Sequence, residues 1–180
     1  MEPRAGAAAS RQGGEAVGAA GADSARPALA ADLAALGRLL EQATAADTLA
    51  DTDRSALEDA VRGLLQDAAA GACEGCRAVV SYVDQAGGGG YFRCELRPSG
   101  GEAVADLHLF HRPRLPVEAA ESWGRRRLAG HPASGFGGDH LFVWPGRFEI
   151  RAFARDDRLR GAERLEGLLE SLPLDALARL

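Results

Sequence analysis

Residues 140–172 read HLFVWPGRFEIRAFARDDRLRGAERLEGLLESL, and this stretch predicts a β-hairpin followed by a helix. The first part is a dense apolar run that ends at Pro145 and Gly146, two residues that favour the central positions of a tight turn. After the turn, apolar and polar residues alternate, as in an antiparallel strand with one face on the core and one face in water. The apolar side of that strand holds Phe148, Ile150, Ala152 and Ala154.

The last part of the stretch predicts a helix on the apolar side of the hairpin. Asp156 and Asp157 can cap its beginning, and Pro173 ends it. Between them, four leucines recur at the i, i+3, i+4, i+7 spacing of one helix face: Leu165, Leu168, Leu169 and Leu172. We expect this Leu-rich stripe to pack on the hairpin.

Further strands and turns precede the hairpin. Residues 78–83 are rich in β-branched residues, and residues 91–97 and 103–111 alternate between apolar and polar side chains. A short helix is expected at 117–127 and a short fourth strand at 128–133, followed by a Gly-rich loop at 134–139. The sequence therefore predicts an α+β fold with one antiparallel sheet of about five to six strands.

The N-terminal part divides into a tail and a helical hairpin. Residues 1–28 are mostly Ala and Gly, with too few large apolar side chains to offset the entropy of ordering them, so we expect a disordered tail. Two leucine stripes then predict two helices, the first with Leu33, Leu36, Leu39 and Leu40 and the second with Leu57, Val61, Leu64 and Leu65. Residues 29–180 are predicted to form a single domain.

The composition argues against two classes of function, nucleic-acid binding and membrane association. All 21 basic residues are Arg, which the base composition of a GC-rich bacterial genome explains best, and the net charge is −5. An acidic chain without a basic stripe does not favour nucleic acid. No run of eighteen apolar residues and no signal peptide is found, so we expect a cytoplasmic protein without a membrane partner.

The cysteines offer one chemical hypothesis. Cys73 and Cys76 form a Cys-x-x-Cys pair that could bind zinc or cycle between dithiol and disulfide, with Cys94 as a third ligand and His108, or His111, as a fourth. The spacing lacks the second tight pair of common zinc sites. Cys94 also shares strand parity with apolar neighbours, which favours a buried thiol. Structural or incidental cysteines are the preferred interpretation, so no cofactor is expected, with zinc as the alternative.

The histidines give no clear active site. An enzyme would place a cleft near His131, Asp139 and His140, but no nucleophile motif accompanies them. Histidines held by backbone contacts are the preferred interpretation. No catalytic residue is predicted.

The aromatic residues allow two interpretations. Trp123, Phe142, Trp144 and Phe153 could form an exposed surface, because Phe153 and part of the preceding strand fall on the side opposite the expected core. The alternative is a sheet covered on both faces, with the N-terminal helices on the second. The order of expected elements resembles that of the acidic, dimeric type III secretion chaperones and that of small sheet domains that end in a Gly-containing strand, a hairpin and a Leu-rich helix, and both likenesses concern the fold alone. From the apolar surface we expect a protein partner, with a homodimer as one form of association. We expect a non-enzymatic protein-binding or regulatory module; the alternative is a zinc-binding or thiol-redox protein.

Overall fold

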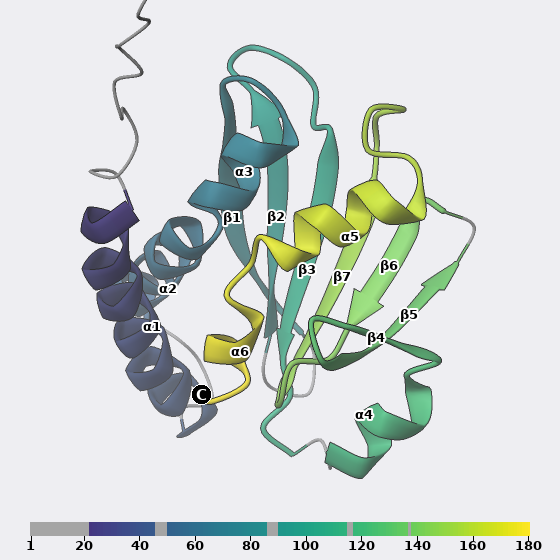
Figure 1. The fold of residues 1–180 in the computed structure, drawn as a ribbon. Helices are drawn as coiled ribbons and strands as arrows, with labels where there is room; N and C mark the ends of the chain where they lie inside the picture. Colours follow the sequence, from purple (N-terminus) through teal and green to yellow (C-terminus); the bar gives the residue numbers. More distant parts are fainter. Residues whose placement is uncertain (1–21, 46–49, 86–89, 115–116, 137) are drawn as a thin grey trace, which may run out of the picture.

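The computed structural model describes residues 22–45, 50–85, 90–114, 117–136 and 138–180. Its centre is one antiparallel sheet of seven strands in the order β1-β2-β3-β7-β6-β5-β4 (Figure 1). The strands are β1 Cys76–Asp84, β2 Gly90–Pro98, β3 Ala105–His111, β4 Arg126–Leu128, β5 His131–Phe136, β6 His140–Val143 and β7 Phe148–Ala154. The α+β class with an antiparallel sheet, predicted from the sequence, is confirmed.

The N-terminal and C-terminal helices lie on the same face of this sheet (Figure 1). They are α1 Ala22–Ala45, α2 Asp51–Leu64, α3 Gln66–Ala72, α5 Ala162–Glu170 and α6 Leu174–Leu177. Helices α2 and α3 contact β1, α5 contacts β6 and β7, and α3 contacts α5, while α1 packs on α2. The remaining helix, α4 Val117–Trp123, lies beside β5. Of the helices in the described ranges, none is both long and apolar enough to cross a membrane.

The hydrophobic core fills the space between the sheet and this helical layer. On β3, Leu107 and Leu109 are buried and pair with Ala152 and Ile150 of β7. The leucines of α5 belong to the same buried cluster, together with Leu57 of α2. The alternation of β7 and the leucine stripe of α5 therefore meet, as the sequence predicts.

The sheet has more strands than predicted because the segment expected as one strand contains a turn that joins two short strands. The segment 128–133 contains the connection between β4 and β5, whose register pairs Leu128 with His131. Ala129 and Gly130 form the two-residue loop and have positive φ angles of 47° and 84°. Positive φ at both central residues is typical of a type I′ hairpin turn, which usually contains Asn or Asp before Gly. The Ala-Gly pair did not indicate it.

The turn between β6 and β7 is shifted by one residue from the prediction. The N–H of Phe148 donates to the carbonyl of Pro145, so Gly146 and Arg147 are the central residues. Gly146 has a φ of 58°, as expected for the first central position of a type II′ turn. A Cβ on Gly146 would lie 2.6 Å from the carbonyl oxygen of Ala178, at the end of α6. The turn is thus packed closely against the C-terminal helix.

Two helix beginnings also differ from the sequence prediction. Helix α1 begins at Ala22, inside the segment 1–28 that is predicted as a disordered tail, and residues 1–21 lie outside the described residues. Helix α5 begins after Gly161 rather than at Asp156 and Asp157. Asp156 instead accepts a hydrogen bond from the backbone N–H of Arg158. This local bond competes with the capping role that the residue type suggests.

Candidate functional site

The face of the sheet opposite the helical layer carries aromatic and charged side chains, and we call it the open face. The alternative in which α1 and α2 cover this face is wrong, because α2 packs on the core side with α3. The strand register aligns the residues of the open face in cross-strand rows. Three of these rows are Val79, Glu95, Asp106, Phe153 and His140; Ser81, Arg93, His108, Arg151 and Phe142; and Val83, Tyr91, Phe110 and Glu149.

The four aromatic residues predicted to bind a protein come together at one end of this face. The ring centroid of Phe142 lies 6.2 Å from that of Phe153 and 6.4 Å from that of Trp144. The Trp144 ring lies 6.0 Å from Trp123 of α4. Trp123 is 48 % exposed, whereas Trp144 is only 5 % exposed. The structure therefore joins the four rings in one cluster, and their binding role stays a prediction.

Further rings extend this cluster across the sheet, and the sequence did not indicate them as protein-binding residues. The His108 ring lies 5.1 Å from that of Phe153, and Tyr91 stacks on Phe110 at 4.8 Å between centroids. The ring centroid of His140 also lies 5.1 Å from that of Phe153. Each of these rings falls on the polar side of its own strand, and this parity is the one sequence signal that could have placed them on the open face. Only the register between distant strands shows that they touch.

Arginine side chains lie over the rings. The Cζ atom of Arg151 is 4.6 Å from the ring centroid of Phe110 and 5.5 Å from that of Phe142. The Cζ atom of Arg112 is 4.7 Å from the Phe110 centroid. A guanidinium over an aromatic face is attracted by the ring quadrupole. These contacts hold the guanidinium groups of Arg151 and Arg112 against the rings.

The centre of the open face has a small positive excess. Strands β2, β3 and β7, with the residues directly after them, contribute five arginines and three carboxylates to it. Glu95 pairs with Arg93 and Arg97, Glu149 pairs with Arg112 and Arg151, and Asp106 pairs with Arg155. Five positive charges against three negative ones leave an excess of two, in a chain whose net charge is −5. The face is therefore electrostatically different from the molecule as a whole.

Two titratable residues are packed into this centre. Asp106 is 4 % exposed; its Oδ2 accepts a hydrogen bond from Arg155, while its Oδ1 is buried without a partner in the described part of the chain. Burial lowers the pKa of His108, Asp106 opposes this shift, and Arg93, Arg151 and Arg155 add to it. Burial and the three arginines therefore favour the neutral form of His108.

The cysteines do not form the predicted metal site. Cys73 and Cys76 are joined by a disulfide that links the end of α3 to the start of β1. Cys94 is buried on the core side of β2, where burial raises the pKa of its thiol, whereas His108 lies on the open face. Across the ranges that the structure describes, no three His, Cys, Asp or Glu side chains are placed to hold a metal ion.

The histidines do not converge on a cleft either. His131 Nε2 lies 3.0 Å from Asp175 of α6, and His140 Nδ1 lies 2.6 Å from Asp139. His140 pairs with Phe136, five residues along β5 from His131. At about 3.3 Å per residue, this places the two histidines roughly 17 Å apart. The cleft of His131, Asp139 and His140 that an enzyme would need is not formed.

No known protein family, curated protein or solved structure matches this chain. The function must therefore be argued from the side chains of the open face. These side chains combine partly exposed rings, arginines and paired carboxylates, and they offer contact area and charge.

Proposed function

We propose that this chain is a non-enzymatic protein-binding module and that the open face is its docking surface. The observation that carries this proposal is the continuous cluster of aromatic rings and arginines on a sheet face opposite the helical layer. Aromatic residues and Arg are the types enriched in the energetically dominant parts of protein interfaces. Their ordered packing also reduces the side-chain entropy that is lost when a partner binds.

The charge of the face indicates the chemistry of the partner. Its excess of two positive charges favours an acidic protein surface, and its partly exposed rings favour apolar side chains on that surface. Complementary charge increases the association rate and selects against basic partners. The proposed partner is therefore an acidic protein that presents apolar side chains.

Single-stranded nucleic acid is the main competing ligand, because rings and arginines on a sheet also suit base stacking. Two features of the open face favour protein. Its five central arginines are paired with three carboxylates, which leaves less positive charge free to neutralise phosphates. Its excess charge is two, whereas tight binding to nucleic acid neutralises many phosphates.

The proposal is tested by photo-crosslinking in cells of the source organism. Benzoylphenylalanine replaces Phe153 in one variant and Arg38, exposed on α1, in a control variant. We expect discrete cross-linked protein products from position 153 and none of the same mass from position 38. Products that nuclease removes, or no product specific to position 153, would overturn the proposal.

The same experiment identifies a homodimer. A second copy of this chain on the open face would give a product of twice the monomer mass, and mass spectrometry would find only peptides of this chain in it. A different protein would contribute peptides of its own. The first result would replace the acidic heterologous partner by self-association.

The disulfide supports a second candidate function, a regulatory thiol switch. Cys73 and Cys76 lie at the C-terminal end of α3, where the helix dipole disfavours a thiolate, so rapid thiol catalysis is not expected. In the cytoplasm, which the sequence predicts as the location, most thiols are kept reduced. The pair would then close only under oxidising conditions, with two electrons and two protons passing to a peroxide or a disulfide oxidant.

A further inference from the structure

The two edges of the sheet differ in length. Strand β4 at one edge has three residues, two of which are arginines, whereas β1 at the other edge has nine residues. Short and charged edge strands resist pairing with another chain, and long ones permit it. The edge of β1 is therefore the place where the sheet can accept an additional strand.

Near both ends of β1, the backbone N–H groups that point away from β2 already donate hydrogen bonds within this chain. The N–H of Tyr82 donates to Glu58 Oε1 of α2 at 2.7 Å, and the N–H of Cys76 donates to the carbonyl of Cys73 at 3.1 Å. Alternate residues of an antiparallel strand direct their backbone groups to the same side. The backbone N–H and carbonyl groups of Ala78 and Val80 therefore also point toward the edge, while both side chains are buried on the core side, and no hydrogen bond among the described residues reaches these two N–H groups.

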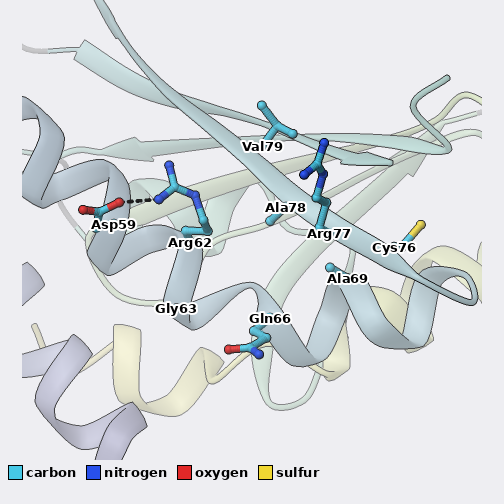
Figure 2. Close-up of a pocket in the computed structure, with 9 residues that line it drawn as sticks. All are labelled: Asp59, Arg62, Gly63, Gln66, Ala69, Cys76, Arg77, Ala78 and Val79. Carbon is cyan, nitrogen blue, oxygen red and sulfur yellow. Dashed lines mark hydrogen bonds and ion pairs between the residues drawn. The ribbon is translucent and has the colours of Figure 1, made fainter. Parts of the chain in front are cut away.

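A pocket of about 730 Å³ lies beside the first half of this edge, where Cys76, Arg77, Ala78 and Val79 line it (Figure 2). It is formed by α2 and α3 on one side and by β1 on the other, and Gly63, Ala69 and Ala78 contribute small residues to its wall. Figure 2 shows Arg62 of α2 and Arg77 of β1 on its two sides. Arg62 pairs with Asp59, whereas Arg77 has no ion pair within the described residues.

We propose that the β1 edge binds an extended peptide segment of a partner by strand addition. Ala78 and Val80 each offer an outward N–H and carbonyl, and only another backbone supplies donors and acceptors at the repeat of a strand. On the open-face side, the added segment would place an acidic residue beside Arg77. It would place an apolar residue two positions away beside Val79, which is 39 % exposed. This site borders the proposed docking surface at Val79 but differs from it in using the backbone groups of the edge strand and not the aromatic cluster.

The experiment selects peptides from a phage-displayed library of random sequences on the full chain with its disulfide intact. We expect the selected peptides, made synthetically, to carry an acidic and an apolar residue two positions apart. Bound peptide should slow amide hydrogen exchange at Ala78 and Val80. Ala78→Pro removes one outward N–H without removing a bond to β2, so it should weaken binding about tenfold.

A second variant keeps the test decisive if Ala78→Pro does not fold. Arg77→Glu reverses the unpaired charge at the pocket and should also weaken the selected peptides, whereas Arg38→Glu on α1 should not. Arg151→Gln on the open face should leave peptide binding unchanged, which separates this site from the docking surface.

Four results would overturn the proposal. They are the absence of enriched peptides, equal affinity for wild type and folded Ala78→Pro, exchange protection confined to other strands, and self-association that Ala78→Pro abolishes. The last result would assign the edge to a second copy of this chain.

Discussion

The guanidinium of Arg151 lies over the ring of Phe142, with 5.5 Å between Cζ and the ring centroid, and it also pairs with Glu149. Both contacts hold the arginine against the sheet. Arg151→Gln keeps most of the side-chain length but removes the charge, so cross-linking of a partner from position 153 should fall several-fold. The free energy of unfolding should change by only about 1 kcal/mol.

Cross-linking yield and urea unfolding of purified protein measure these two effects. Arg38→Gln on α1 serves as the control, because it removes one charge away from the open face. Unchanged cross-linking in Arg151→Gln would show that this arginine takes no part in binding. A loss of stability of several kcal/mol would assign it a mainly structural role.

The rings of the open face should matter less for stability than rings of equal size in the core. Phe92 is fully buried on the core side of β2, while Phe153 is partly exposed. We expect Phe92→Ala to lower the free energy of unfolding by about 3–5 kcal/mol and Phe153→Ala by about 1 kcal/mol. Urea unfolding of both variants measures the difference. Equal losses would mean that Phe153 is a core residue and not part of a docking surface.

The sequence predicts the inner architecture well because local periodicity reports burial. The alternation of β7 identified Ile150 and Ala152 as core residues, and the leucine spacing identified the face of α5 that covers them. Both signals depend on neighbours along the chain. The turn at Ala129 and Gly130 was missed because its backbone angles, and not its residue types, define it.

The open face was only half predictable, because its geometry depends on pairing between distant strands. Phe142 and Phe153 were singled out from their strand parity, but nothing local shows that His108 of β3 touches Phe153 of β7. The side of the sheet on which the N-terminal helices pack is likewise determined by tertiary contacts and not by the local sequence. Strand pairing also separates two of the predicted metal ligands, because Cys94 of β2 and His108 of β3 lie on opposite faces of the sheet.

The disulfide predicts a definite thiol count. With Cys73 and Cys76 oxidised and Cys94 buried, native protein should expose no reactive thiol, one after denaturation, and three after denaturation with a reductant. Cys73→Ser should lower the free energy of unfolding by about 2 kcal/mol at most, because the loop that the disulfide closes is very short. Maleimide labelling and mass spectrometry give the count. Two thiols that react in native protein without reductant would contradict the oxidised pair.

Two histidines should make the protein less stable in mild acid. Burial lowers the pKa of His108, and burial together with Arg147 lowers that of His111. A histidine whose pKa is lower in the folded state binds its proton more readily in the unfolded chain. Its stabilising effect is therefore complete above the unfolded value of about 6.5, falls as the pH decreases below it, and levels off below the folded pKa.

Urea unfolding between pH 8 and pH 5.5 measures this effect, and His108→Gln should reduce it. Charged residues from neighbouring strands surround His108, so the variant must be compared at constant ionic strength; they are Arg93, Asp106, Arg151 and Arg155. Stability that rises as the pH is lowered through this range would contradict the lowered pKa values.

Substitutions at two glycines distinguish the energetic cost of backbone strain from that of steric contact. Gly146 and Gly100 both have positive φ angles, 58° and 76°, but only Gly146 has a close neighbour, Ala178 at 2.6 Å from a built Cβ. Gly100→Ala should lower the free energy of unfolding by about 1–2 kcal/mol, the cost of a left-handed conformation for an L-residue. Gly146→Ala should lower it by at least about 1 kcal/mol more, because the added methyl group pushes α6 away from the turn. Thermal and urea unfolding of the two variants test this, and equal effects would show that α6 does not pack on the turn between β6 and β7.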